Sequence, residues 1–132
     1  MRVLIAEDEL ISLKIVESAL KNVSDPDFAL DGQEAFRKFK EAFDAGKRYD
    51  LICLDVNMPR EDGLDCLARI REYEEKKGVV GEACVKVLMV SGVTDPVSVC
   101  DATSLGCTAY LTKPLNTAKF KNEVTRLGLA AH

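Results

Sequence analysis

Residues 50–55, which read Asp-Leu-Ile-Cys-Leu-Asp, decide the fold, because they are apolar in the middle and acidic at both ends. A short and nearly continuous apolar run of this kind predicts a strand that is buried on both faces. Turn residues follow in 57–63, and Leu64, Leu67 and Ile70 then recur at helical spacing. A strand, a turn and a helix in this order form the repeating unit of a parallel α/β sheet.

The same unit recurs on both sides of this stretch. Further strands are predicted at residues 2–6, 28–30, 83–90 and 107–111. Amphipathic helices are predicted around 13–23, 35–43, 64–77, 96–105 and 117–127, the last one capped by Asn116 or Thr117. Right-handed crossovers then favour a five-stranded doubly wound parallel sheet of order 2-1-3-4-5 with five helices, the flavodoxin-like arrangement. The length of 132 residues fits a single domain over 1–132.

Composition excludes several classes of function. With 18 Lys and Arg against 22 Asp and Glu, the net charge is −4, and the chain lacks the positive field that nucleic-acid binding requires. The apolar runs are far shorter than the roughly 20 residues of a membrane helix, and the N-terminal run is too short for a signal peptide. The five cysteines have no CxxC spacing, which favours free thiols in a reducing cytoplasm over disulfides or zinc.

Polar side chains gather where the predicted strands end. In open α/β sheets, ligands bind beyond the carboxyl ends of the strands, so residues at these ends indicate function. Each of them has an ordinary explanation by itself, such as a helix start, a cap or a solvated lysine. Their common position at the carboxyl ends of the strands favours a shared binding or catalytic site instead. The residues concerned are Glu7, Asp8, Asp55, Ser91, Tyr110 and Lys113.

The residue types at this edge indicate phosphoryl chemistry. Three carboxylates repel one another, and oxygen ligands without His or Cys select Mg²⁺ rather than Zn²⁺. The single histidine, His132, is the last residue, which argues against a histidine metal site or Ser-His catalysis. A carboxylate can itself be the nucleophile that becomes an aspartyl phosphate. Lys113 would place a positive charge on the phosphoryl oxygens, and Ser91 would donate a hydrogen bond to them.

From residue 3 to residue 127, the chain resembles the receiver domain of two-component response regulators, in the stand-alone form of the chemotaxis regulator. The residues that carry the resemblance are Glu7-Asp8, Asp55, Met58-Pro59, Gly63, Ser91-Gly92, Tyr110 and Lys113-Pro114. Gly92 is a small departure, because the family often has Ala there. The resemblance implies a diffusible cytoplasmic signalling protein.

The resemblance also implies a magnesium site and a phosphoacceptor. Asp55 corresponds to the phospho-accepting aspartate and to a ligand of Mg²⁺. Asp8 would hold the ion directly and Glu7 through water, while the backbone carbonyl of Asn57 would complete the metal shell.

The remaining matched residues imply a switch. Lys113 corresponds to the lysine that pairs with the phosphoryl group, and the bond from Lys113 to Pro114 is expected to be cis. Ser91 corresponds to the switch hydroxyl and Tyr110 to the switch aromatic. A sensor histidine kinase or phosphotransfer protein would donate the phosphoryl group. A downstream protein would bind the surface of the fourth helix, fifth strand and fifth helix. No enzymatic activity is implied beyond self-phosphorylation and autodephosphorylation.

Other interpretations stay open. The chain can be a receiver excised from a hybrid kinase or another multidomain protein. A magnesium-dependent aspartyl phosphatase would want a second carboxylate at Asn57, and a flavodoxin would want a phosphate-binding loop in place of Glu7-Asp8-Glu9. A pseudo-receiver with a dead site is disfavoured, because all the chemical residues are present. Residues 71–83 are expected to form a solvated helix end.

Overall fold

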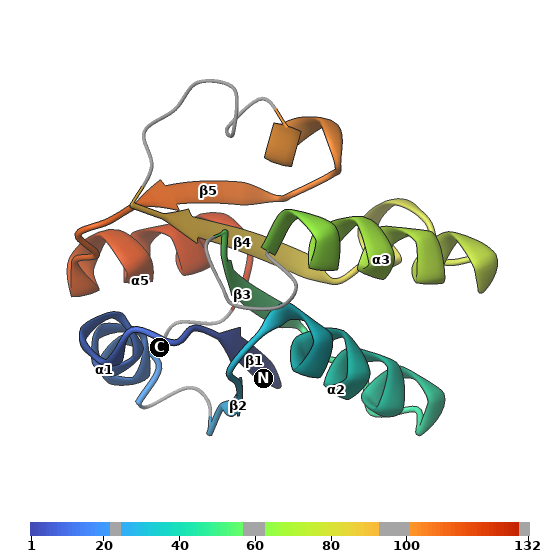
Figure 1. Ribbon diagram of the computed structural model, residues 1–132, viewed down its shortest axis with the longest axis horizontal. Coiled ribbons are helices and arrows are strands. Elements are labelled where there is room, and N and C mark those ends of the chain that lie inside the picture. Colours follow the sequence, from blue (N-terminus) through green and yellow to red (C-terminus); the bar gives the residue numbers. More distant parts are fainter. Residues whose placement is uncertain (22–24, 57–62, 93–100, 130–132) are drawn as a thin grey trace.

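Five parallel strands form one sheet in the computed structural model, which describes residues 1–21, 25–56, 63–92 and 101–129. The strands are β1 (Val3–Ala6), β2 (Asp27–Ala29), β3 (Leu51–Asp55), β4 (Lys86–Ser91) and β5 (Ala109–Thr112). Their order is β2-β1-β3-β4-β5, which confirms the predicted doubly wound topology (Figure 1). β3 lies in the middle of the sheet and is buried along its whole length, as its apolar sequence requires.

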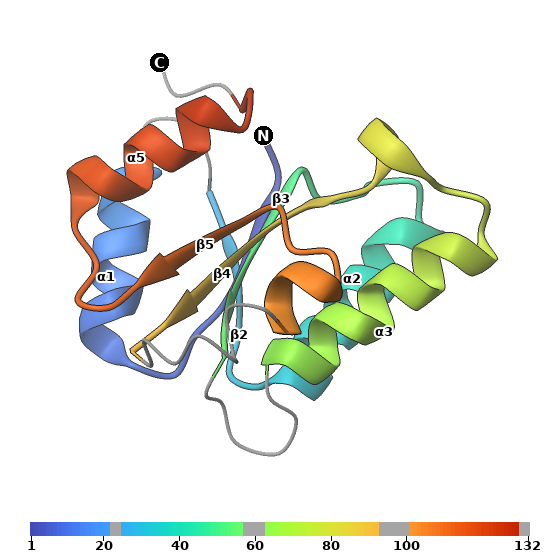
Figure 2. The same ribbon diagram turned by 90° about the horizontal axis from the view of Figure 1, so that it is seen from above.

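Helices cover both faces of the sheet. They are α1 (Leu10–Ala19), α2 (Gly32–Asp44), α3 (Gly63–Lys76) and α5 (Thr117–Arg126). Residues 101–104 are also helical and belong to the helix predicted at 96–105, whose beginning lies outside the described residues. Figure 2 shows α1 and α5 on one face and α2 and α3 on the other. No helix in the described part of the chain is long and apolar enough to span a membrane.

The core has two halves because neighbouring residues of a strand point to opposite faces of the sheet. In β3, Ile52 packs in the half covered by α2 and α3, whereas Cys53 packs in the half covered by α1 and α5. The first half contains Phe39 of α2, and the second contains the fully buried Phe120 of α5. The predicted apolar stripes of α2 and α5 therefore contribute Phe39 and Phe120 to the two halves of the core.

Polar side chains close the ends of two helices. The carboxylate of Asp31 accepts a hydrogen bond from the backbone N–H of Glu34 at 2.8 Å and caps α2. The side chain of Asn116 accepts from the N–H groups of Ala118 and Lys119 at the start of α5. Of the two residues predicted to cap the last helix, Asn116 is the cap.

The connection from α3 to β4 differs from the prediction. The strand begins at Lys86, and residues Gly81–Ala83 form a short 3-10 helix, η1, so the predicted start at 83 is wrong. Residues 71–83 are not simply a solvated helix end, because Glu74 is only 2% exposed.

Glu74 is buried because it satisfies polar groups of two other segments. Its carboxylate accepts a hydrogen bond from the backbone N–H of Val85 at 2.7 Å and pairs with Arg71 at 2.7 Å. Arg71 also donates to the carbonyls of Val85 and Gly106, at 2.9 and 3.0 Å. A buried carboxylate needs such partners to offset the loss of water. This network ties the end of α3 to the beginning of β4 and to the turn before β5.

The cysteines behave as small apolar side chains. Cys53 and Cys66 are buried, Cys84 and Cys107 are half-buried, and all four are free thiols. Burial raises the pKa of the Cys53 thiol above its usual value, with a smaller contribution from the charge of Glu7. Cys100 lies outside the described residues. The prediction of free thiols is confirmed for these four cysteines.

The Glu74 network leads to a stability prediction. Replacing the side chain in Glu74→Ala leaves the N–H of Val85 and the guanidinium of Arg71 without their buried partner. The free energy of unfolding should fall by about 3 kcal/mol, measured by urea denaturation. The matched control is Glu75→Ala, which removes the adjacent exposed carboxylate and should change stability by less than about 0.5 kcal/mol. Equal losses in the two variants would contradict a structural role for Glu74.

Candidate functional site

Three carboxylates meet at the carboxyl ends of β1 and β3. The two strands are parallel neighbours, and Ala6 of β1 is paired with Leu54 of β3. The residues that follow, Glu7 and Asp55, therefore lie side by side. One carboxylate oxygen from each of Glu7, Asp8 and Asp55 lies within 4.8 Å of the others. Glu7 and Asp55 are buried, whereas Asp8 is exposed at the rim of the cluster.

Lys113 supplies positive charge to this cluster from the loop after β5. Its Nζ lies 2.9 Å from Oδ2 of Asp55 and 3.0 Å from Oε1 of Glu7. The loop is held in place because the backbone N–H of Lys113 donates to the carbonyl of Ser91 at 2.7 Å. The peptide bond between Lys113 and Pro114 is cis, as the family resemblance implied.

The two buried partners of Lys113 change the pKa of its ammonium group. Burial by itself would lower the pKa of Lys113, but the hydrogen bonds and charges of Asp55 and Glu7 outweigh it and raise this pKa. The ammonium is therefore firmly charged at neutral pH.

The pKa of Glu7 reflects its burial and the nearby negative charge of Asp55. Its pKa rises to about 7, first because the side chain is buried and then because Asp55 lies beside it. The backbone N–H of Glu9, which donates to Glu7 at 3.0 Å, and the ammonium of Lys113 oppose this shift. One ammonium does not fully offset the buried carboxylates, and a divalent cation would stabilise their charged forms.

Gly63 allows the first turn of α3 to lie directly against the backbone of Asp55. A Cβ atom at this position would lie 2.3 Å from the carbonyl oxygen of Asp55, which is impossible without displacement. The N–H of Gly63 donates to the carbonyl of Val56 at 3.0 Å and fixes the same approach. Glycine is therefore required here by space, and it holds the backbone that carries the Asp55 carboxylate.

Ser91 and Tyr110 lie on the neighbouring strands β4 and β5. Ser91 is fully buried at the carboxyl end of β4, next to Thr112 of β5 in the register. Tyr110 is half-buried and packs against the half of the core that α2 and α3 cover. Its hydroxyl oxygen is buried without a hydrogen-bond partner among the described residues. A side chain with an unsatisfied hydroxyl gains from a second arrangement that provides a partner.

The structure brings together Glu7, Asp8, Asp55 and Lys113, and it places Ser91 and Tyr110 on the adjoining strands. Asn57 lies outside the described residues.

Sequence reasoning missed Glu9 as a member of this cluster. Its Oε2 lies 3.5 Å from Nζ of Lys113, and its Oε1 accepts a hydrogen bond from Ser12. Glu9 directly precedes α1 but does not cap it through its side chain. The signal that could have found it is the unbroken acidic run of residues 7–9.

The family model described as the response regulator receiver domain matches residues 3–125. The chain belongs to this family.

Individual relatives carry this domain within longer proteins. The osmosensing histidine protein kinase SLN1 of Saccharomyces cerevisiae is 28% identical over 127 residues, which cover 95% of this chain and 10% of that protein. A protein-glutamate methylesterase/protein-glutamine glutaminase of Trichodesmium erythraeum is 33% identical, over 87% of this chain and 30% of that protein. The chain thus spans less than a third of the length of these two relatives.

Solved structures show the same fold. One is a chain of the co-crystal structure of the histidine phosphotransfer signaling protein Ypd1 and the receiver domain of its downstream response regulator Ssk1, from S. cerevisiae. It has a TM-score of 0.84 and 29% identity, over 97% of this chain and 88% of that chain. Another belongs to the CheX–CheY–BeF3–Mg complex of Borrelia burgdorferi, with a TM-score of 0.82 and 27% identity, over 98% of this chain and 90% of that chain.

The close approach of Gly63 to Asp55 gives a second prediction. Gly63→Ala should lower the free energy of unfolding by about 2 kcal/mol, because the added methyl group overlaps the Asp55 carbonyl. Gly92→Ala is the matched control, since its Cβ would lie 4.0 Å from the nearest side-chain atom, Cβ of Lys113. This control should stay within about 0.5 kcal/mol of the parent protein in urea denaturation. Full stability of Gly63→Ala would show that the backbone contact imposes no constraint.

Proposed function

We propose that residues 1–132 form a single receiver domain in which Asp55 accepts a phosphoryl group from a phosphohistidine. The observation that carries the proposal is the ammonium of Lys113 between the buried carboxylates of Asp55 and Glu7, at 2.9 and 3.0 Å. A phosphoryl group that arrives at Asp55 would meet a fixed positive charge already in contact with the acceptor. Such preorganised charge is the largest contribution to phosphoryl transfer in most sites of this kind.

The donor set fits Mg²⁺. Three carboxylate oxygens within 4.8 Å of one another offer hard ligands to a hard cation. In the proposal, Asp8 and Asp55 hold the ion directly, Glu7 supports it through water, and the backbone carbonyl of Asn57 is a further ligand. Bound Mg²⁺ would screen the carboxylates from the negative charge of the incoming phosphoryl group.

The chemical step uses the side chains of this chain as follows. A carboxylate oxygen of Asp55 attacks phosphorus, a P–O bond forms, and the P–N bond to the donor imidazole breaks. The imidazole nitrogen keeps the electron pair of that bond and takes up a proton from solvent. Lys113 then pairs with a phosphoryl oxygen. Hydrolysis of the acyl phosphate by water returns Asp55 to its free form, so the chain acts as a switch without turning over a separate substrate.

The proposed switch runs through Ser91 and Tyr110. The hydroxyl of Ser91 would donate to the new phosphoryl group, and the movement of β4 would alter the packing of Tyr110 on the next strand. The hydroxyl of Tyr110 is buried and has no hydrogen-bond partner within residues 1–21, 25–56, 63–92 and 101–129. This supports the role, because a rearrangement can add a hydrogen bond. The altered surface, formed by the fourth helix, β5 and α5, would bind a downstream protein.

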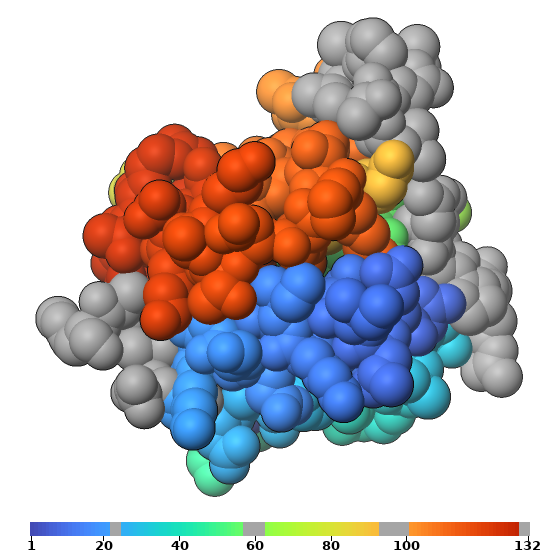
Figure 3. All heavy atoms as spheres, turned by 90° about the vertical axis from the view of Figure 1, so that its left-hand side faces the viewer, coloured from blue at the N-terminus to red at the C-terminus, as the bar shows by residue number. Residues whose placement is uncertain are grey.

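A histidine kinase or phosphotransfer protein is the proposed donor, acting in the cytoplasm. The similarity to a receiver domain crystallised with Ypd1 supports such a partner. Leu10 and Ile11, in the first turn of α1, are 63% and 69% exposed and follow the acidic residues directly. Figure 3 looks onto the side of the molecule where α1 (blue) lies beside α5 (orange to red). Exposed apolar side chains that directly follow the acidic residues 7–9 favour a docked protein donor.

A receiver domain within a hybrid kinase is the second candidate. It is favoured by the similarity to SLN1, which covers 95% of this chain but only 10% of that protein.

The role of Asp55 is tested by labelling with acetyl phosphate and Mg²⁺. Asp55→Asn should abolish acid-labile phosphorylation, and chelation of Mg²⁺ with EDTA should abolish it in the parent protein. Asp50→Asn is the matched control, because Asp50 directly precedes the same strand at its opposite end. The control should be labelled at the parent rate. Persistent labelling of Asp55→Asn would overturn the assignment.

The docking role of α1 is tested with two donors. Ile11→Asp should slow phosphoryl transfer from phosphorylated Ypd1 by about tenfold, because it places a charge in an apolar contact. The rate with acetyl phosphate should not change, since that donor needs no docking surface. Val80→Asp is the matched control. Val80 is 71% exposed and precedes β4, so it lies toward the amino ends of the strands, away from the acidic cluster. Equal slowing in both variants, or slowing with both donors, would count against docking at α1.

A further inference from the structure

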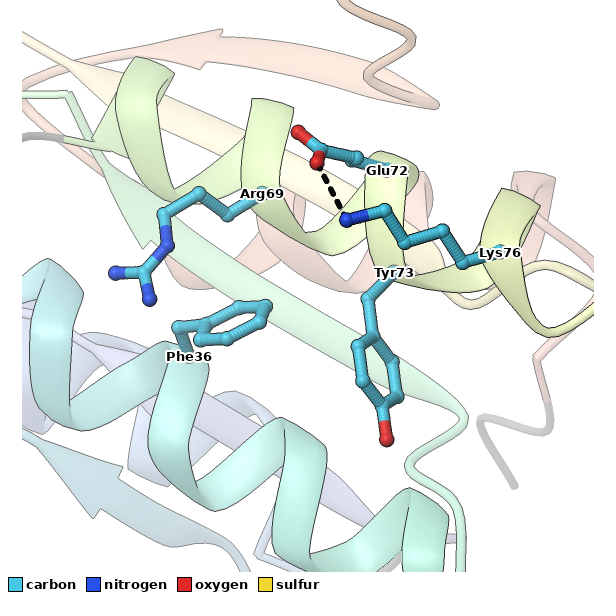
Figure 4. A pocket seen from close by; sticks show the side chains of 5 residues that line it. All are labelled: Phe36, Arg69, Glu72, Tyr73 and Lys76. Carbon is cyan, nitrogen blue, oxygen red and sulfur yellow. Dashed lines mark ion pairs between the residues drawn. The ribbon is translucent and has the colours of Figure 1, made fainter.

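A hollow of ≈ 210 Å³ lies between α2 and α3 (Figure 4). It is lined by Phe36, Arg69, Glu72, Tyr73 and Lys76, none of which belongs to the acidic cluster. The volume is smaller than the pockets that hold cofactors or drug-sized ligands, which start at about 300 Å³. A hollow of this size fits one large side chain of a partner better than a free small molecule.

Aromatic rings form its rigid, apolar part. The rings of Phe36 and Tyr73 meet edge-on, with centroids 6.0 Å apart and planes at 85°. Tyr73 meets Phe43 in the same way, at 5.4 Å and 86°. All three rings are half-buried, so each keeps part of its surface toward solvent. Edge-to-face packing of this kind fixes the positions of the rings and leaves an apolar surface between the helices.

Exposed cations stand over these rings. The guanidinium of Arg69 lies 4.2 Å from the centroid of Phe36, and that of Arg48 lies 5.1 Å from Phe43. The ammonium groups of Lys40 and Lys77 lie 5.9 and 5.5 Å from Tyr73. Significant cation–π contacts occur about once per 70–80 residues, so four around the same three rings are a concentration of charge. Rings attract cations without neutralising them, so the charges of Lys40, Arg48 and Lys77 can still attract an anionic partner.

The local charge is opposite in sign to that of the chain. We call the residues around the three rings the α2–α3 seam. Its charged members are Lys40, Asp44, Arg48, Arg69, Glu72, Lys76 and Lys77. Five of them are positive and two are negative, whereas the whole chain has a net charge of −4. A basic surface on an acidic protein attracts acidic partners over roughly a Debye length.

The two carboxylates of the seam favour an acidic peptide over a nucleic acid as the partner. Glu72 pairs with Lys76 at 2.9 Å, and Asp44 accepts a hydrogen bond from the hydroxyl of Tyr73. These negative groups stand among the cations and would repel a continuous phosphate backbone. An acidic peptide can place its carboxylates opposite the cations and keep uncharged groups opposite Glu72 and Asp44.

We propose that the α2–α3 seam binds an acidic segment of a partner protein and takes one large apolar side chain of that segment into the hollow. The binding surface lies on the sheet face opposite to α1 and α5, and it does not use Asp55 or Lys113. The interaction would therefore be independent of phosphorylation. A partner could stay bound to the seam while Asp55 is phosphorylated and dephosphorylated.

The test uses a defined peptide and fluorescence anisotropy. The probe is an octapeptide with six glutamates around a central Leu-Phe pair, labelled at its N-terminus. Saturable binding to the parent protein is expected, with the same affinity before and after acetyl phosphate treatment. Arg69→Glu and Lys77→Glu should each weaken binding by about fivefold, because each reverses a charge over a ring that lines the hollow. A peptide with glutamines in place of the glutamates should not bind.

Lys14→Glu is the matched control, since it makes the same charge change at an exposed residue of α1 on the other face of the sheet. It should weaken binding by less than about twofold, through long-range charge alone. Circular dichroism and labelling by acetyl phosphate should be unchanged in all three variants, so a loss of folding or of the phosphorylation site is recognised separately. Equal weakening by Lys14→Glu and Arg69→Glu, or no saturable binding to the parent protein, would overturn the proposal.

Discussion

The ammonium of Lys113 lies in contact with two buried carboxylates at the carboxyl ends of different strands, and the rest of the site depends on this contact. Asp55 and Glu7 are 3% and 4% exposed, so neither can be stabilised by water alone. Burying two like charges is costly unless a cation lies between them. Removal of the lysine would leave the pair uncompensated, and arrival of a phosphoryl group would replace one of its partners. The same contact therefore stabilises the site as it stands, and in the proposed reaction it would rearrange.

The parallel sheet is what makes this contact available. Neighbouring parallel strands end at the same edge, so residues about 50 and 100 positions apart in the chain meet without long loops. Gly63 then lets α3 begin against the backbone of Asp55, where any larger residue would collide with its carbonyl. At the other end of the strands, where β4 begins, a separate network around Glu74 fixes the start of β4. The Glu74 network thus lies at the amino ends of the strands, apart from the acidic cluster at their carboxyl ends.

Patterns that are local in sequence were predictable, and so was the cluster that follows from the strand order, whereas the contacts of single side chains with distant partners were not. The apolar run of residues 50–55 predicted β3 to within one residue, because a strand that is buried on both faces needs a continuous run of apolar residues. Glu7, Asp8, Asp55 and Lys113 were predictable as a cluster once the strand order was inferred. Glu74 was missed because its burial depends on the N–H of Val85 and on Arg71. Glu9 was missed because a residue before a helix resembles an ordinary helix start.

The most direct test of the account is to map the phosphorylated residue itself. The protein is treated with acetyl phosphate and Mg²⁺ and then with borohydride, which reduces an aspartyl phosphate to homoserine. Tandem mass spectrometry of the peptides locates the change. Conversion of Asp55 alone is expected. Conversion of Asp8 or another carboxylate in its place, or no conversion while a phosphorylated control receiver is reduced, would contradict it.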